Sequence, residues 1–403
     1  MMTNLFEEAG YDVVQYSDIA DVYVINTCTV TNMSERKSRQ ILRRAKEINP
    51  NSILCVVGCY VQVAKSELES LSEIDILLGT NERKDIVKYV EEYQNSRLEA
   101  VEDIMKKQEY LEWGGTAYSS HERAEIKIQD GCDRFCTYCI IPYARGPVRS
   151  RKMDDIYNEV LKLVENGVKE VVITGIHISS YGKDFKDGTS LIDVLEMVNS
   201  IDGIKRIRLG SLEPLIITDD FVGRLKKLDK ICNHFHLSLQ SGCDATLARM
   251  NRRYLTNDFK KIVNLLRENI KDVALTTDVI VGFPGETDDE FKQTFDFLND
   301  VNFSKMHIFK YSPRRGTKAI SFPNQVDGNT KTIRSDILIQ MSDENEKKFA
   351  EKYIGNEIEV LFENEEMGHT TNYISVIDEN KSQVAGTLKC VVPKSYKNES
   401  LYI

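Results

Sequence analysis

The sequence predicts a mixed α/β protein with three successive parts: a Rossmann-like domain, an open barrel of strand–helix units, and a small C-terminal β-barrel of OB type. Three observations carry this prediction. Apolar, β-branched runs alternate with helical patterns in the first part, further strand-then-helix units follow, and after residue 352 the chain changes to short strands. We expect the three domains to span residues 1–95, 124–352 and 353–403. Residues 96–123, which include Trp113, are expected to form a linker.

The first part is predicted from helices and strands in alternation. A helix at 2–9 ends at Gly10, a residue suited to a helix C-cap. The other expected helices lie at 34–48, which stops before Asn49-Pro50, and at 82–93. Buried strands are expected at 22–26, 53–57 and 74–78. This order is typical of a parallel sheet with helices on its faces.

The second part contains strand-then-helix units, whose expected strands are 125–129, 170–174, 206–210, 235–240, 274–281 and 306–310. The expected helices are 153–166, 191–200, 219–228, 257–268 and 288–298. Six such strands indicate a partial (β/α)6 barrel, and active sites of such barrels lie at the carboxyl ends of the strands. A charged helix at 333–352 is expected to pack back on the barrel, and short strands follow at 358–362, 373–376 and 384–388. Small barrels of OB type often bind RNA; the alternative is a β cap without a ligand.

The composition is that of a soluble globular protein, with 41% hydrophobic and 29% charged residues. No run approaches the roughly 20 apolar residues of a membrane helix, and the start lacks the features of a secretory signal. We therefore expect a cytoplasmic protein with no membrane partner. The nine cysteines, an odd count, argue against a disulfide framework. The net charge of −10 disfavours a general polyanion binder, so any contact with nucleic acid must be local.

Three cysteines, Cys132, Cys136 and Cys139, have the spacing C-x3-C-x2-C just after an expected strand. A loop this short can turn three thiolates toward one point, which suits an iron–sulfur cluster or a zinc ion. Structural zinc sites have four ligands, usually in two C-x2-C pairs, and no fourth Cys or His lies nearby in the sequence. A cubane with three cysteine ligands leaves one iron open to a substrate or cofactor. The alternatives are a zinc site or three free cysteines.

Two further cysteines, Cys28 and Cys59, each fall just beyond the carboxyl end of an expected strand. Neighbouring parallel strands would bring them to one edge of the sheet; the alternative is that they are buried strand-end cysteines. The helix after Cys28 is basic, and its candidate RNA-binding residues are Arg36, Lys37, Arg39 and Arg43. Such a helix is either a solvated face or a phosphate-binding surface.

Polar and small residues also follow the ends of the barrel strands. The candidates are Gly175, Ser211, Glu213, Gln240, Gly282, Gly285 and Glu286. Gly282 and Gly285 allow close backbone approach, as an adenosine group requires. Each residue alone has the alternative of a loop or capping role. Their common place at one rim of the barrel predicts a ligand site.

Several of these stretches together resemble the radical S-adenosylmethionine (SAM) methylthiotransferases. They are 26–30, 57–60, 131–142, Arg145-Gly146, 149–151, 240–242, 282–286 and 368–374. The resemblance covers nearly the whole chain and implies an N-terminal cluster domain, a radical SAM barrel and a C-terminal TRAM domain. Within the family, the branch that acts on threonylcarbamoyladenosine in tRNA is the most similar, on the basis of 36–40 and 140–146.

The resemblance implies two 4Fe-4S clusters and S-adenosylmethionine as cofactors. Cys132, Cys136 and Cys139 match the catalytic ligands of the radical cluster, and Cys28 and Cys59 match two of three auxiliary ligands. The third family cysteine follows an opening strand that is missing here, so we expect either a truncated start or an auxiliary cluster that is incomplete or differently ligated. Tyr138 and the turn at 282–286 are expected to contact S-adenosylmethionine, and the remaining rim residues are weaker candidates. The C-terminal module is short for a TRAM domain.

The implied activity is the addition of a 2-methylthio group to N6-threonylcarbamoyladenosine next to the anticodon. The implied partners are tRNA, an electron donor such as flavodoxin or ferredoxin, and a sulfur donor whose identity the sequence does not give. Within the enzyme class, the alternative substrates are isopentenyladenosine in tRNA and an aspartate of a ribosomal protein. From another class, the alternative is a non-catalytic iron–sulfur protein that binds RNA.

Overall fold

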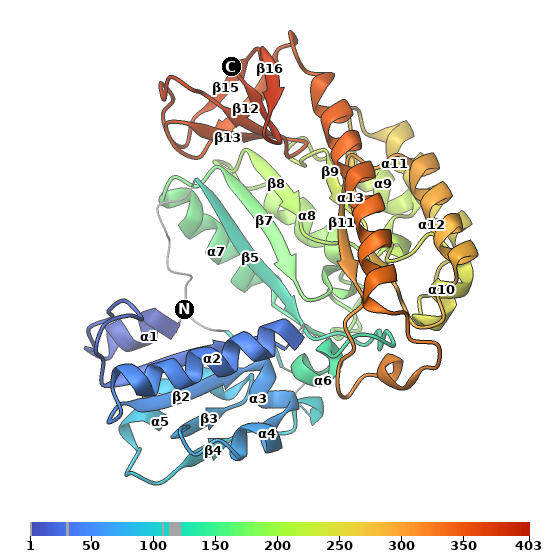
Figure 1. Ribbon diagram of the computed structural model, residues 1–403. Coiled ribbons are helices and arrows are strands. Elements are labelled where there is room, and N and C mark those ends of the chain that lie inside the picture. The colour runs from blue at the N-terminus through green and yellow to red at the C-terminus, as the bar shows by residue number, and fades with distance from the viewer. Residues whose placement is uncertain (1, 30–31, 107–108, 113–121) are drawn as a thin grey trace. The chain divides into compact units, whose positions relative to one another are not determined.

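The computed structural model describes residues 2–29, 32–106, 109–112 and 122–403 (Figure 1). The chain forms two compact units. The first contains residues 1–117, 130–149 and 312–320, and the second contains 118–129, 150–311 and 321–403. The cysteine loop thus belongs to the same unit as the N-terminal sheet. The domain boundaries predicted along the chain remain predictions, and Trp113 lies outside the described residues.

The first unit is built on a parallel sheet. Its strands follow the order β1 (Val22–Thr27), β2 (Ile53–Gly58), β3 (Ile76–Leu78) and β4 (Leu98–Ala100). The first three are the predicted strands. β4 lies inside the range that the sequence predicts as a linker, because a strand of three residues is too short to show a periodic pattern.

Helices cover both faces of this sheet. The core on one face joins the sheet to α2 (Asn32–Ile48), α3 (Cys59–Val63) and α4 (Lys65–Glu69). The core on the other face joins it to α1 (Met2–Glu8) and to α5 (Ile86–Glu91), which a 3-10 turn at Glu82–Asp85 precedes. Burial on both faces explains why β2 reads as an unbroken apolar run. A 3-10 turn at Ile104–Lys106 and the helix α6 (Ile141–Arg145) complete this unit.

The second unit contains the predicted strands of the open barrel in sequence order. One sheet has the order β6 (Arg149–Ser150), β5 (Arg123–Asp130), β7 (Glu170–Gly175) and β8 (Arg206–Leu209). The other consists of β9 (His234–His236), β10 (Ala274–Val281) and β11 (Lys305–Lys310). Isolated bridges from Ile207 to Ile231 and from Leu212 to Leu237 join the two sheets. No closed barrel forms among the described residues, which confirms the prediction of an open one.

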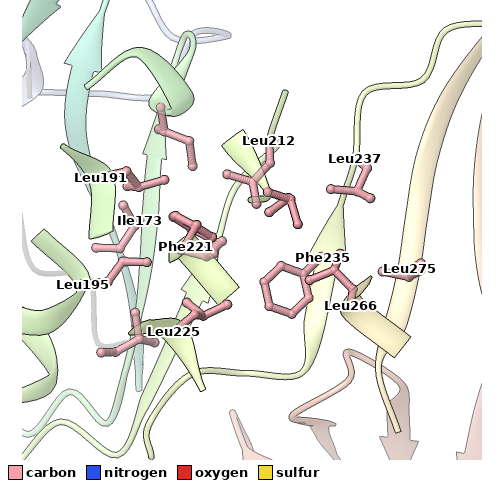
Figure 2. Close-up of a cluster of buried hydrophobic side chains, with 14 of the residues drawn as sticks. Ile173, Leu191, Leu195, Leu212, Phe221, Leu225, Phe235, Leu237, Leu266 and Leu275 are labelled. Carbon is pink, nitrogen blue, oxygen red and sulfur yellow. The ribbon is translucent and has the colours of Figure 1, made fainter. Parts of the chain in front are cut away.

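Helices pack on the outer face of these strands. They are α7 (Met153–Glu165), α8 (Leu191–Asn199), α9 (Asp219–Leu225), α10 (Asp244–Arg249), α11 (Thr256–Asn269) and α12 (Asp288–Val301). The core between the two layers includes Ile173 of β7, Leu195 of α8, Phe221 of α9 and Phe235 of β9 (Figure 2). Each fully buried side chain of this kind stabilises the fold by about 1.5–3 kcal/mol relative to an exposed one. This layer fixes the strand ends on which the candidate site residues sit.

The C-terminal part begins with the long helix α13 (Gly328–Glu351), which packs along β11 (Figure 1). Asp327 caps it by accepting hydrogen bonds from the backbone N–H groups of Asn329 and Thr330. The sheet that follows has the order β15 (Leu388–Val391), β12 (Ile358–Phe362), β13 (Met367–Thr370), β14 (Ser375–Ile377), β17 (Ser400–Tyr402) and β16 (Ser395–Lys397).

This C-terminal sheet differs from the expected barrel of OB type. Among the described residues its end strands, β15 and β16, do not pair, so the sheet stays open. The strands are only three to five residues long, and Pro393, which has no N–H group to donate, separates β15 from β16. None of the described helices has the length and apolar character needed to cross a membrane.

Candidate active site

Backbone register places the two strand-end cysteines at one edge of the first sheet. Thr27 of β1 is the register partner of Gly58 of β2, and Cys28 and Cys59 are the residues that follow them. The Thr27 hydroxyl donates to the Val57 carbonyl at 2.6 Å, which ties the two strand ends together. Gly58 has φ +104°, and a Cβ there would lie 2.7 Å from the Thr27 carbonyl oxygen. Only glycine therefore fits at this crossing.

Two arginines accompany these cysteines within the first unit. Burial lowers the pKa of Arg145, but Asp130, Cys59 and Cys28 more than offset this and raise the pKa above its usual value, with a hydrogen bond between Arg145 and Cys59 contributing. Burial, together with the positive charge of Arg145, lowers the pKa of Arg83 to about 10. Positive charge beside a thiol favours its thiolate form, which is the form that binds a metal.

The C-x3-C-x2-C loop is held by its backbone. Gly131 has φ +75°, and a Cβ there would lie 1.8 Å from the Pro147 carbonyl oxygen. The N–H of Cys132 donates to the Gly146 carbonyl at 3.0 Å, and the N–H of Cys139 donates to the Cys136 carbonyl at 2.9 Å. Further along, the N–H of Ala319 donates to the Thr137 carbonyl at 2.9 Å. The loop is therefore anchored at its start and in its middle, and the bond between Cys139 and Cys136 closes a turn within it.

The thiols of this loop fit an iron–sulfur cluster by donor type and spacing. Burial, reinforced by the nearby charge of Cys136, raises the pKa of Cys132 to about 11, while the N–H of Arg134 acts in the opposite direction. As the side chains stand, no group of three or more His, Cys, Asp or Glu residues is arranged around one point to hold a metal ion within the described part of the chain. Rotation about the Cα–Cβ bonds moves the sulfur atoms without moving the anchored backbone.

A buried ionic network stabilises the residues that flank the C-x3-C-x2-C loop. Asp130 accepts a hydrogen bond from the N–H of Gly131 at 2.8 Å and lies 3.4 Å from the guanidinium of Arg145. Arg149, which is 2% exposed, donates to the Arg145 carbonyl at 2.7 Å and lies 3.7 Å from Asp130. The third arginine of this stretch, Arg151, pairs with Glu159. Arg149 and Arg151 are thus engaged by the protein itself.

At the carboxyl ends of β7 and β8, the rim candidate Glu213 belongs to a hydrogen-bonded group. His177 Nε2 and Glu213 Oε2 are 2.9 Å apart, and the Glu213 carboxylate is buried. The N–H of Glu213 donates to the Ser179 hydroxyl at 2.9 Å. Ser211 is exposed nearby in the chain, and Gly175 ends β7. The His177–Glu213 pair gives this rim a charged, hydrogen-bonding character.

Gln240 is held in a strained backbone conformation. Its φ is +73°, a region that residues other than glycine rarely adopt. Its N–H donates to the Asp278 carbonyl and its own carbonyl accepts from Ile280, both at 2.9 Å. Such strain costs about 1–3 kcal/mol and clusters at functional sites. This observation supports Gln240 as a site residue.

The turn at 282–286 is stabilised by its own glutamate. Glu286 Oε1 accepts from the N–H of Gly282 at 2.9 Å and from Arg334 at 2.6 Å. A Cβ at Gly282 would lie 2.3 Å from the Lys331 side chain, so the glycine makes room for Lys331. The N–H of Gly285 donates to the Asn324 carbonyl at 2.8 Å. The hydrogen-bonding groups of Gly282, Gly285 and Glu286 named here therefore stabilise the conformation of the turn itself.

The basic helix α2 divides into exposed and engaged side chains. Lys37 and Arg43 are exposed. Arg39 donates to the Tyr60 hydroxyl at 2.6 Å and lies 3.8 Å from Glu67. The side chain of Arg36 lies outside the described residues. Of the candidate RNA-binding residues, Lys37 and Arg43 are therefore available to a phosphate.

Comparison with known proteins identifies the family. Residues 126–298 match the model of the radical SAM superfamily, and residues 1–79 match an uncharacterized protein family, UPF0004. The chain is 41% identical over 395 residues to the threonylcarbamoyladenosine tRNA methylthiotransferase of Bacillus subtilis, and the match covers 95% of this chain and 88% of that protein. The chain belongs to the radical SAM methylthiotransferases. The family resemblance stated from the sequence is thus confirmed.

Other relatives of this methylthiotransferase carry two different substrate names. The threonylcarbamoyladenosine tRNA methylthiotransferase of Aquifex aeolicus is 38% identical, over 97% of this chain and 96% of its own length. The tRNA-2-methylthio-N(6)-dimethylallyladenosine synthase of Clostridium tetani is 35% identical, over 90% and 82%. Among solved structures, the radical SAM methyltransferase TsrM from Kitasatospora setae shares the fold, with a TM-score of 0.58 at 14% identity over 77% of this chain and 71% of that one.

Family membership implies a 4Fe-4S cluster and S-adenosylmethionine for this methylthiotransferase. Sequence patterns predicted the cysteines and the residues at the carboxyl ends of the barrel strands. They did not predict the supporting residues Asp130 and Arg83, or the pairing of His177 with Glu213. Asp130 precedes the glycine of the cysteine loop, which was a usable signal for a turn. Arg83 lies in a charged helical stretch and gave no signal in the sequence.

Proposed function

We propose that this methylthiotransferase adds a methylthio group to C2 of N6-threonylcarbamoyladenosine next to the anticodon of tRNA. The observation that carries the proposal is the 41% identity over 95% of the chain to a relative named for that substrate. A second relative with that name is 38% identical, whereas those named for dimethylallyladenosine are at 35–36%. Because the margin is small, dimethylallyladenosine (isopentenyladenosine) in tRNA is the second candidate. An aspartate of a ribosomal protein is a third, and no relative named above favours it.

Cys132, Cys136 and Cys139 are the proposed ligands of the catalytic 4Fe-4S cluster. When bound, such a cluster with one open iron supplies the electron that reductively cleaves S-adenosylmethionine. The protein's part is to hold the three thiolates on an anchored loop. The N–H of Arg134 favours the thiolate of Cys132, which must lose its proton to bind iron. An electron donor such as flavodoxin or ferredoxin is part of this proposal.

Cys28 and Cys59 are the proposed ligands of a second, auxiliary cluster, which would hold the sulfur that is transferred. Their support is the register of β1 and β2, which brings them to one sheet edge. Arg145, which hydrogen-bonds with Cys59, and Arg83 would favour anionic sulfur at this edge. The sulfur donor that refills the site belongs to the same proposal.

The proposed contacts to S-adenosylmethionine are Tyr138 beside the cluster ligands and the rim residues Gly175, Ser211, Glu213 and Gln240. Gln240 has the strongest support, because its backbone strain needs a compensating role. Gly282, Gly285 and Glu286 are proposed to present their turn to the cofactor while Glu286 holds its shape. Lys37 and Arg43 are proposed to contact tRNA phosphates, with Arg36 and Arg39 beside them on α2. A phosphate contact of this kind would weaken as salt is raised.

The experiment is mass spectrometry of tRNA nucleosides from cells with and without this gene. We expect 2-methylthio-N6-threonylcarbamoyladenosine to disappear on deletion and to return when the 403-residue chain is expressed. Expression of the Cys132→Ala variant is the matched control and should not restore it. If that nucleoside is unchanged and the methylthiolated isopentenyladenosine disappears instead, the second candidate holds. If no methylthiolated nucleoside changes, the tRNA substrate is wrong.

A further inference from the structure

A cavity lies at the amino ends of β9, β10 and β11, opposite the rim that carries the proposed cofactor contacts. Its volume is about 380 Å³, within the range of sites for small ligands. Residues of the barrel, of α13 and of the C-terminal sheet line it, all within the second unit. Four of the six histidines of the chain face it: His234, His236, His307 and His369. The proposed methylthiolation chemistry gives none of these four a role.

One wall of the cavity is a column of aromatic rings. The rings of His369 and Tyr373 stack with centroids 4.9 Å apart and planes 20° apart. The ring of His234 lies 5.2 Å from that of Tyr373, tilted by 30°. The guanidinium of Arg208 is 4.6 Å from the Tyr373 ring centroid. Stacked aromatic rings with an arginine are the surface on which proteins hold unstacked nucleobases.

Tyr373 takes its position in the aromatic column with an unfavourable backbone conformation. Its φ is +68° although it is a bulky residue, and 43% of its surface is exposed. A left-handed backbone conformation at a large aromatic residue is unfavourable and persists where the ring has a purpose or the surroundings force it. Here the ring stays partly exposed at the cavity, so the strain is compatible with a ligand-binding role.

The polar groups of the cavity are neutral or already paired. His234 is 9% exposed, its Nε2 lies 3.1 Å from the Thr276 hydroxyl, and its Nδ1 has no hydrogen-bond partner in the part of the chain that the structure describes. Burial lowers the pKa of His234 to about 3, so the ring is neutral near pH 7. Lys305 is neutralised by Glu346 at 2.8 Å and Glu399 at 3.1 Å. An unpaired nitrogen, buried in a cavity, needs a hydrogen-bond partner.

These features exclude two classes of ligand. A metal ion is disfavoured because three of the histidines are already engaged, His234 and His236 with the Thr276 hydroxyl and His369 with Glu363. A free anion is disfavoured because both cationic groups here are already paired, Lys305 with two carboxylates and Arg208 with Glu170. What remains is an uncharged, planar group with a hydrogen-bonding edge.

We infer that this cavity binds a nucleobase, which packs on the exposed part of the Tyr373 ring and hydrogen-bonds with His234 Nδ1. The nucleobase can come from two molecules. The first is the tRNA substrate, which would supply an unstacked base, and this case rests on the proposed function. The second source with the same chemistry is a free nucleoside. Because the cavity is at the opposite end of the strands from the proposed active rim, the base it takes is a different one from the base that is methylthiolated.

The first test is binding of an anticodon stem-loop RNA to the full chain, measured by fluorescence anisotropy. Tyr373→Asn removes the ring and keeps a residue that tolerates positive φ. We expect it to weaken binding roughly fivefold or more, as loss of one base-stacking contact does. Tyr157→Ala is the control. It removes a side chain on α7 that is 40% exposed and lies outside the cavity, and it should leave binding unchanged.

A second variant, His234→Phe, keeps an aromatic ring but removes the ring nitrogens. It should also weaken binding, so the test does not depend on one variant folding. Thermal melting confirms that each variant folds.

The second test identifies the source of the base. Stem-loops that each lack one base are titrated against the wild type and Tyr373→Asn. If the base comes from the RNA, one abasic position lowers wild-type affinity and abolishes the difference between the two proteins. If RNA affinity is unaffected by the variants but free adenosine, guanosine, cytidine or uridine binds in equilibrium dialysis and Tyr373→Asn loses it, the ligand is a free nucleoside. If neither RNA nor any free nucleoside responds to Tyr373→Asn or His234→Phe, the inference is wrong. The nucleoside analysis of cells is independent of this result, so either proposal can fail alone.

Discussion

The two sets of cysteines in the first unit are positioned in different ways. Cys28 and Cys59 sit at strand ends, where the pairing of Thr27 with Gly58 fixes their backbones. Cys132, Cys136 and Cys139 sit in a loop that takes its shape from a glycine turn and from single backbone hydrogen bonds. A parallel sheet thus places two cysteines through many hydrogen bonds, whereas the loop places three through a few.

This difference predicts how each set of cysteines responds to a substitution nearby. A strand end is part of a cooperative core, so a change there costs stability of the whole unit. A loop with few anchors can lose its shape while the core stays folded. The proposed catalytic cluster is therefore the more easily disturbed of the two by a local change, and the following experiments are ordered by the size of the expected effect.

The largest contrast is expected in thiol reactivity of the metal-free protein. Because burial raises the pKa of Cys132 to about 11, roughly one thousandth of this thiol is ionised at pH 8. Its alkylation by iodoacetamide should be slow and should rise about tenfold per pH unit toward pH 11. Cys28 and Cys390 are exposed and should be labelled first, while the buried Cys55 should resist. Peptide mass spectrometry of anaerobically treated protein measures this; equal labelling of Cys132 and Cys390 at pH 8 would contradict the burial argument.

The next effect is expected at Gly131. A Cβ there meets the Pro147 carbonyl oxygen at 1.8 Å with φ at +75°, so Gly131→Ala must move the loop. We expect the loop to be displaced and to fail to load iron, because it can move while the core of the unit stays folded. Gly10→Ala is the matched control, since Gly10 has φ +86° and no atom within 4 Å of the added Cβ. The control should lose only about 1–2 kcal/mol in denaturant unfolding. Equal iron loading by both variants would show that the loop is not tightly anchored.

A smaller effect is expected at the sheet edge. Gly58→Ala places a Cβ 2.7 Å from the Thr27 carbonyl oxygen, a milder clash than at Gly131. We expect a loss of roughly 2–3 kcal/mol in the free energy of unfolding, because β1 and β2 must separate slightly. Iron bound at Cys132, Cys136 and Cys139 should be retained. Loss of that iron in a folded Gly58→Ala protein would count against independent positioning of the two sets.

The same contrast explains what the sequence could predict. The apolar runs that became β1, β2 and β10 are long enough to be recognised as buried strands, so the sheet edge of Cys28 and Cys59 followed from pattern alone. The three residues of β4 were too few to detect. The spacing of Cys132, Cys136 and Cys139 indicated a cluster because local spacing is sufficient for that inference.

The remainder depends on contacts between residues distant in the chain. No local pattern pairs Arg334 with Glu286, or His177 with Glu213, because these pairs form only when helices and strands pack. For the same reason, no local pattern indicated that Tyr373 would contact His234, which lies in a different sheet. The predicted C-terminal barrel stayed open because short strands and Pro393 limit pairing, and strand patterns alone do not encode closure.

The most direct test of the central claim is reductive cleavage of S-adenosylmethionine by the anaerobically reconstituted protein, followed as 5′-deoxyadenosine. We predict that Cys132→Ala abolishes cleavage, whereas Cys59→Ala keeps cleavage and loses transfer of the methylthio group to RNA. Iron should fall by about four per chain in Cys132→Ala, the content of one cubane. Cleavage that persists in a folded Cys132→Ala protein would contradict the assignment of the radical chemistry to this loop.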